Sequence, residues 1–114
     1  MAATQRILLL NSEATFRLLL QFRGYEVTMA HSFQEARQEL GASLYNLVVV
    51  QVEFDRHSAL QFCEELKRDY PAMKVALLAH HTLYFPPNTC PDDVIVRQDG
   101  PSQFLKQVEQ LVTV

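Results

Sequence analysis

Glycine and cysteine are scarce in this 114-residue chain, which has three glycines and two cysteines. None of the glycines lies in a loop where the backbone could closely approach a phosphate, so a glycine-rich nucleotide or flavin site is not expected. Cys63 and Cys90 are too few for a disulfide framework, and neither belongs to a CxxC pair. We therefore interpret Cys63 as a small buried residue.

Positive charge is also limited. Ten Lys and Arg residues are outnumbered by 13 Asp and Glu, for a net charge of -3, and the basic residues are scattered along the chain. Without a basic stripe to neutralise phosphates, no nucleic-acid binding is expected. The first apolar run, residues 7–10, is too short for a signal sequence or a membrane span. We therefore expect a cytoplasmic protein that does not bind membranes.

Short apolar runs alternate with longer segments of helical periodicity. The runs are residues 7–10, 25–29, 47–50, 75–78 and 94–96. This alternation is typical of a parallel sheet covered by helices, and right-handed crossovers favour the strand order 2-1-3-4-5. The sequence therefore predicts one doubly wound α/β domain over residues 1–114, with its functional site at the carboxyl edge of the sheet.

The first two helices are marked by their ends. Ser12 can cap a helix that runs through Phe22, with Gly24 just past its apolar face. Residues 32–35, Ser-Phe-Gln-Glu, form a capping box that opens a second helix, which is expected to stop at Gly41.

A third helix is predicted from Ser58, as its cap, until Pro71, and a last helix after Gly100-Pro101. The last helix has one apolar stripe, made of Phe104, Leu105, Val108, Leu111 and Val112. Between residues 80 and 91, three prolines leave little room for an ordinary helix. We therefore expect a shortened or missing fourth helix.

The third apolar run and its flanks read YNLVVVQVEF over residues 45–54, with Gln51 directly after the buried part. This run resembles the third strand of a response-regulator receiver domain (CheY-like), and the resemblance extends over residues 6–112. It implies a five-stranded, flavodoxin-like fold and a two-component (phosphorelay) signalling role. In such receivers the position of Gln51 holds the phosphoacceptor aspartate, whereas a carboxamide is uncharged and a poor nucleophile.

Four other positions depart from the receiver pattern. Asn11 and Ser12 stand where the resemblance implies two metal-binding acids. Ala79 replaces an expected Thr or Ser hydroxyl, and Arg97 replaces an expected lysine. Aspartyl phosphorylation needs a nucleophile, a divalent cation and groups that neutralise the phosphoryl oxygens. We therefore predict a degenerate phosphorylation site at these four positions and Gln51, in a pseudo-receiver that is not an enzyme and holds no cofactor.

The same positions have structural interpretations as well. The two polar residues after the first strand can form a turn and a helix cap, and Gln51 can hydrogen-bond to nearby loop backbone. Arg97 can pair with Glu53 or Asp55. One of these two carboxylates could instead serve as a displaced phosphoacceptor, although in-line attack requires a strict geometry.

Metal binding and small-ligand binding are the alternative functions. His57, His80 and His81 should lie at the same edge of the sheet as Glu53 and Asp55, and imidazole with carboxylate suits Zn²⁺. These histidines have no HExxH spacing, so we interpret them as solvated loop residues and expect no metal. The first loop carries hydroxyls at a helix N-terminus that could hold a phosphate, but it lacks glycine.

A partner surface is predicted from the proline-rich stretch. Leu83, Tyr84 and Phe85 are expected to form an exposed apolar patch, with Phe104 of the last helix as a further member. In receivers the fourth helix, fifth strand and fifth helix commonly form the output or dimer face, so the resemblance implies a protein partner and allows a homodimer. Leu83 and Phe85 can instead fold back onto the sheet in place of the missing helix.

Overall fold

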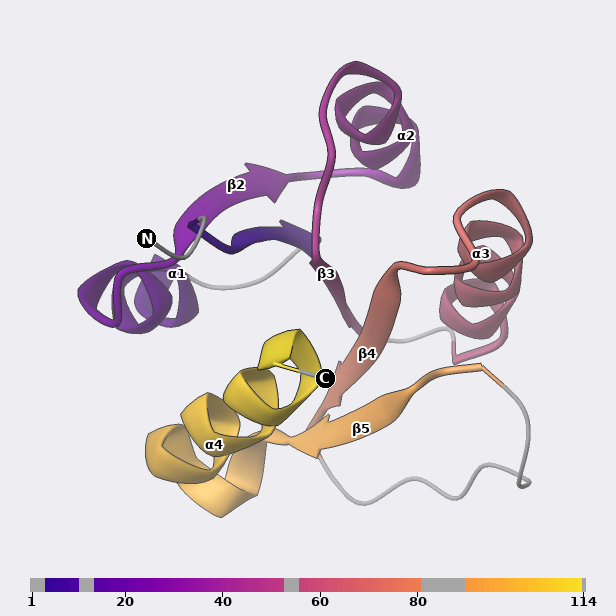
Figure 1. Cartoon of the computed structure of the whole chain (residues 1–114). Helices are drawn as coiled ribbons and strands as arrows, with labels where there is room; N and C mark the ends of the chain where they lie inside the picture. The colour runs from indigo at the N-terminus through magenta and orange to yellow at the C-terminus, as the bar shows by residue number, and fades with distance from the viewer. Residues whose placement is uncertain (1–3, 11–13, 53–55, 81–89, 114) are drawn as a thin grey trace.

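Five parallel strands form a single sheet in the order β2-β1-β3-β4-β5 in the computed structural model of the chain (Figure 1). The structure describes residues 4–10, 14–52, 56–80 and 90–113. The strands are β1 (Arg6–Leu10), β2 (Glu26–Ala30), β3 (Leu47–Gln51), β4 (Lys74–Ala79) and β5 (Asp93–Val96). The predicted doubly wound, flavodoxin-like fold and its strand order are confirmed.

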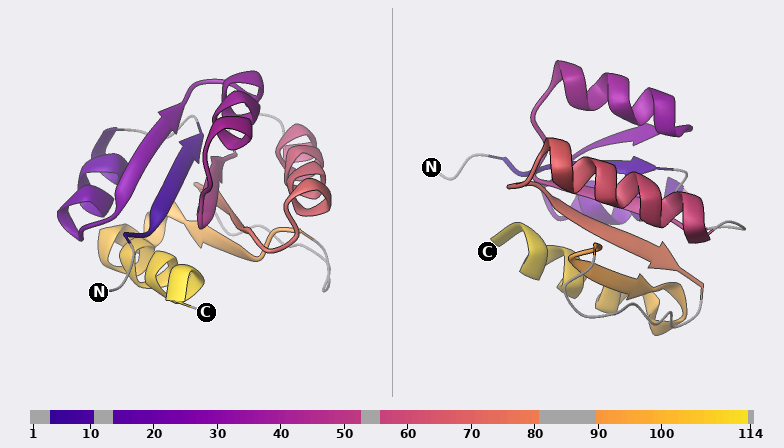
Figure 2. Two further views of the ribbon diagram at one scale, coloured as in Figure 1. Left: turned by 45° about the horizontal axis from the view of Figure 1, so that its top comes forward. Right: turned by 90° about the vertical axis from the view of Figure 1, so that its right-hand side faces the viewer.

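The helices lie on both faces of this sheet. They are α1 (Ala14–Phe22), α2 (Phe33–Ala42), α3 (Arg56–Asp69) and α4 (Gly100–Thr113), with a 3-10 turn, η1 (Arg97–Asp99), before α4. Helices α1 and α4 cover one face, and α2 and α3 cover the other (Figure 2). None of the helices in the described ranges is long and apolar enough to cross a membrane.

Strand β3 divides the core into two layers because successive side chains of a strand point to opposite faces. Val48 and Val50 belong to the layer beneath α2 and α3, whereas Leu47 and Val49 belong to the layer beneath α1 and α4. All four side chains are buried. The unbroken apolar run therefore reflects a central strand covered on both sides.

The helix ends mostly follow the predicted signals. Gly24 has φ +91° after α1, and the Tyr25 amide donates to the Leu20 carbonyl at 3.1 Å, as expected for a left-handed C-terminal cap. Ser32 Oγ accepts a hydrogen bond from the Glu35 amide at 3.1 Å and caps α2. Helix α2 ends at Ala42, one residue later than predicted.

The predicted cap at Ser58 is wrong, because α3 already begins at Arg56 and Ser58 lies within its first turn. A serine is tolerated at this position because the amides of the first turn have no acceptor within the helix, so a hydroxyl nearby does not compete with helical hydrogen bonds. The proposed cap Ser12 lies outside the described residues. So do residues 81–89, on which the predicted short fourth helix falls; within the described part of the chain, no helix stands between β4 and β5.

The two cysteines form a disulfide, which the sequence did not predict. Cys63 lies in α3 and is fully buried, as expected, but it is bonded to Cys90, 27 residues further along the chain. The chain returns toward α3 just before β5, which places the two Cα atoms 6.0 Å apart. Because this contact depends on the path between β4 and β5, no local spacing in the sequence signals it.

Candidate functional site at the carboxyl edge of the sheet

Three of the five predicted positions lie at the carboxyl ends of neighbouring strands. Gln51 ends β3 and pairs in register with Leu78, so Ala79, the last residue of β4, extends one position further. Ala79 in turn pairs with Val96, the last residue of β5, and Arg97 follows directly. The parallel register therefore brings Gln51, Ala79 and Arg97 to one edge of the sheet.

Gln51 lies on the side of the sheet covered by α1 and α4, because it continues the alternation of Leu47 and Val49. Its side-chain oxygen Oε1 is buried and, within the described residues, accepts no hydrogen bond. The structural interpretation of Gln51 as a partner of loop backbone is therefore not seen in the described part of the chain. An orphaned buried acceptor costs stability, typically about 1–3 kcal/mol.

Ala79 is 3% exposed and contributes only a methyl group to the edge. It supplies no hydroxyl to bind an oxyanion.

Arg97 retains a positive charge at the end of β5. Its guanidinium carbon lies 5.8 Å from the centre of the Phe16 ring of α1, within cation-π range. Arg97 is partly exposed and therefore sits between the apolar layer and the solvent. The predicted pairing of Arg97 with Glu53 or Asp55 falls on residues outside the described ranges.

The remaining members of the predicted site, Asn11 and Ser12, also lie outside the described residues. The three described positions hold an amide, a methyl group and a guanidinium. A carboxamide neither attacks a phosphoryl donor nor supplies the anionic oxygen that Mg²⁺ prefers. At these three positions the edge thus holds one cation and no nucleophile.

The proposed zinc ligands are only partly described. His57 and His80 are exposed, and His81, Glu53 and Asp55 lie outside the described residues. Among the described residues, no group of three His, Cys, Asp or Glu side chains is arranged to hold a metal.

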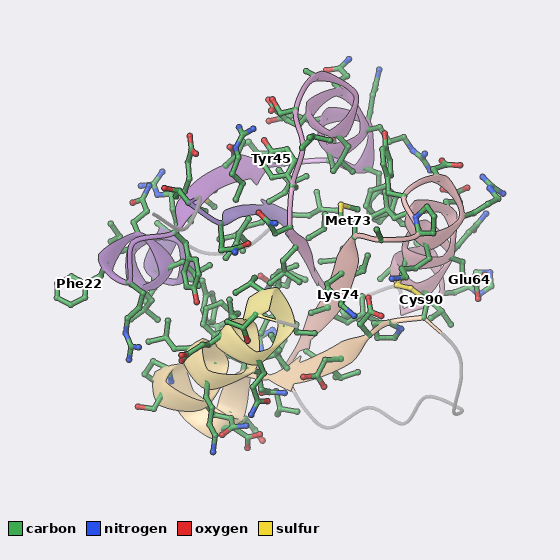
Figure 3. All side chains as sticks on the ribbon, viewed as in Figure 1. Phe22, Tyr45, Glu64, Met73, Lys74 and Cys90 are labelled. Atoms are coloured by element: carbon green, nitrogen blue, oxygen red, sulfur yellow. A yellow bond between two sulfur atoms is a disulfide. The ribbon has the colours of Figure 1, made fainter. Side chains whose placement is uncertain are left out.

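A hollow of about 470 Å³ opens at the opposite, amino-terminal edge of the sheet. Its lining includes Leu44, Tyr45, Met73 and Lys74, the last three labelled in Figure 3. Of the predicted phosphorylation site, the three described positions, Gln51, Ala79 and Arg97, do not contribute to this lining.

Phe104 is not part of a partner surface, contrary to the prediction. It is 1% exposed, and its ring centre lies 4.7 Å from that of Phe16. The apolar stripe of α4 faces the sheet, so Phe104 belongs to the core. The other predicted members of the patch, Leu83, Tyr84 and Phe85, lie outside the described residues.

Some apolar side chains that the sequence analysis did not single out are exposed instead. Phe22 is 91% exposed and projects from the end of α1 (Figure 3), and Leu44 is 86% exposed before β3. Leu18, one turn before Phe22 on α1, is also exposed. Most residues of α1 are apolar, and a helix that packs on one side only cannot bury all of them. This composition could have predicted that some apolar side chains of α1 are exposed.

No protein-family model matches the sequence, and no curated protein matches it. Solved structures, however, resemble it along nearly its whole length. A receiver domain protein (CheY-like) from Methanospirillum hungatei is 19% identical, with a TM-score of 0.83, and the match covers 97% of this chain and 95% of that one. A response regulator from Thermotoga maritima is 23% identical, with a TM-score of 0.82 and coverage of 98% and 100%.

A third similar structure is the Thermotoga maritima response regulator TrrA, solved in complex with Mg²⁺ and BeF. It is 24% identical, with a TM-score of 0.78, over 95% of this chain and 99% of TrrA. The chain therefore has the CheY-like fold of response-regulator receiver domains.

Proposed function

We propose that the chain is a pseudo-receiver, a signalling module of two-component type that binds protein partners and is not switched by aspartyl phosphorylation. The observation that carries this proposal is Gln51, an amide at the end of the central strand of a receiver fold. Ala79, at the end of the neighbouring strand, supports it, because no hydroxyl stands there to follow a phosphoryl group.

The module acts by binding rather than by catalysis, in the cytoplasm. The three described positions of the degenerate site retain only the guanidinium of Arg97, which cannot form a bond to phosphorus. A protein that keeps a receiver fold without its nucleophile still presents the surfaces of that fold. Leu83, Tyr84 and Phe85 are the proposed partner surface, and the proposed partners include a second copy of the chain.

A phosphoryl-transfer assay tests this function. The purified chain is incubated with Mg²⁺ and acetyl phosphate, and the intact mass is followed at neutral pH. We expect no phosphoryl adduct. An adduct would contradict the proposal, and peptide mapping with Glu53→Gln and Asp55→Asn variants would show whether one of these carboxylates is a displaced acceptor.

A further inference from the structure

The disulfide between Cys63 and Cys90 ties the middle of α3 to the chain just before β5 (Figure 3). We propose that this bond is a reversible redox-modification site. Exchange with a low-molecular-weight thiol opens it at Cys90 and frees this part of the chain from α3, while the sheet stays intact. This inference goes beyond the proposed function and does not depend on the degenerate site.

The two cysteines differ in exposure. Cys63 is 0% exposed and lies in the layer between the sheet and α2 and α3, whereas Cys90 is partly exposed at the margin of that layer. A thiolate from solvent therefore reaches Cys90 first. Access to the attacked sulfur is one of the main determinants of the rate and direction of exchange.

The exchange balances with two equivalents of a thiol. The first thiolate attacks Cys90 Sγ, forms a mixed disulfide and releases Cys63 as a thiolate, which takes up a proton. The second attacks the outer sulfur of the mixed disulfide and releases the small-molecule disulfide and the Cys90 thiol. The protein gains two electrons and two protons, and two thiols are oxidised to one disulfide.

The position of Cys63 favours re-formation of the bond. Phe62, Leu66 and Val75 belong to the same apolar layer, which keeps Cys63 in place on the inner side of α3. When Cys63 loses its proton, it can displace the small thiol from a mixed disulfide on Cys90 and so act as the resolving thiol. In the cytoplasm proposed above, protein disulfides are usually transient, which also favours a reversible role.

Asp92 limits how far the chain is released from α3 when the disulfide opens. The Asp92 amide donates to the Val75 carbonyl at 2.8 Å, and its Oδ2 accepts from the Val75 amide at 2.8 Å and from Lys67 Nζ at 3.1 Å. Lys67 Nζ also donates to the Met73 carbonyl at 2.8 Å. These bonds hold the start of β5 to β4 and α3 independently of the disulfide.

The first test follows the bond in the intact chain. Samples starting fully reduced and fully oxidised are equilibrated with graded mixtures of reduced and oxidised glutathione, alkylated, and mapped by peptide mass. We expect both series to reach the same graded fraction of Cys63–Cys90 bond, with the mixed disulfide on Cys90. A bond that never forms, or that stays closed at every ratio, would overturn the proposal.

Single-cysteine variants test the entry point. With oxidised glutathione, Cys63→Ala should be modified at Cys90, and Cys90→Ser should be modified at Cys63 at least about tenfold more slowly. Equal rates in folded variants would contradict entry at Cys90. If either variant fails to fold, the position of the mixed disulfide in the parent chain decides the question.

Amide NMR of the parent chain tests how far the release extends. On reduction, the ¹⁵N relaxation of Cys90 should report faster local motion, whereas the hydrogen exchange of Val75 and Ile95 should change less than about twofold. Loss of protection at Ile95 would show that the bond holds the sheet itself, and unchanged relaxation at Cys90 would show that nothing is released. Either result would overturn the proposed local tether.

Discussion

Gln51 of β3 lies in register with Leu78 of β4, which fixes the amide at the carboxyl edge of the sheet, next to the end of β4. The amide oxygen is buried and accepts no hydrogen bond within the described residues. The end of β3 therefore carries a carboxamide, which is a poor nucleophile, and its buried oxygen has no partner among the described residues.

Replacing Gln51 with methionine should raise the free energy of unfolding by about 1 kcal/mol, because it removes a buried acceptor that has no partner among the described residues, while keeping the side-chain length. Urea unfolding followed by circular dichroism measures the change. Gln61→Met, on the exposed surface of α3, is the matched control and should stay within about 0.5 kcal/mol of the parent. A loss of stability in Gln51→Met would mean that the amide makes a contact the protein needs.

Phe104 of α4 is buried and Phe22 of α1 is exposed, so alanine variants of the two residues test which ring belongs to the core. Phe104→Ala should lower the free energy of unfolding by about 3–5 kcal/mol, because the ring fills the core against Phe16. Phe22→Ala should change it by less than about 0.5 kcal/mol, since that ring is 91% exposed. Similar losses in both variants, by chemical denaturation, would contradict the assignment of Phe104 to the core.

The ion pair between Lys67 and Asp92 should matter more than the exposed pair between Arg68 and Asp69. Asp92→Ala removes the acceptor of the Val75 amide as well as the ion pair, so a loss of about 2 kcal/mol is expected. Asp69→Ala breaks a pair at 3.4 Å on the surface of α3 and should cost less than about 0.5 kcal/mol. Equal effects in thermal and urea unfolding would argue against the anchoring role of Asp92.

Stability should fall at alkaline pH because of Tyr45. Burial raises the pKa of the Tyr45 hydroxyl above its usual value, and the carboxylate of Glu39, which accepts its hydrogen bond at 3.2 Å, adds to the shift. The unfolded chain ionises first, so the stabilisation is complete below the unfolded pKa of about 10 and is lost as pH rises through the folded value.

Tyr45→Phe removes the ionisable hydroxyl and tests this pH dependence. It should flatten the fall of the unfolding free energy above about pH 10, at a cost of about 1 kcal/mol at neutral pH for the lost hydrogen bond. The measurement is urea unfolding from pH 7 to pH 11. An unchanged alkaline slope in the variant would exclude Tyr45 as the source.

The proposed partner surface has its own test. Tyr84→Ser combined with Phe85→Ser should weaken association with a partner or with a second copy while leaving the unfolding free energy within about 0.5 kcal/mol. Sedimentation and denaturation of the same sample measure both quantities. Lost stability with unchanged association would favour the alternative, in which these side chains pack onto the sheet.

The sequence predicted the sheet well because its signals are local. The unbroken run that ends at Gln51 identifies a central strand, and the Ser32 cap and Gly24 mark helix ends through contacts within a few residues. The order of the strands and the site at their carboxyl edge then follow from right-handed crossovers.

The features missed by the sequence analysis depend on contacts between distant segments. The bond from Cys63 to Cys90 and the anchoring of Asp92 by Lys67 both require the chain to return over α3 before β5.

Phe104 is a different case, because its local pattern was sufficient. It belongs to the apolar stripe of α4, and this periodicity places it on the inner side of the helix. The resemblance to receivers implied a partner surface there, and that prediction was wrong.

The most direct test of the pseudo-receiver proposal is an amide NMR titration of the ¹⁵N-labelled chain with Mg²⁺ and then with beryllofluoride, a phosphoryl mimic. TrrA, which has been solved with Mg²⁺ and BeF, serves as the positive control. The proposal predicts an unchanged spectrum for this chain. Saturable shifts clustered at Gln51, Ala79 and Arg97 would contradict it, because the site would then still accept a metal and a phosphoryl group.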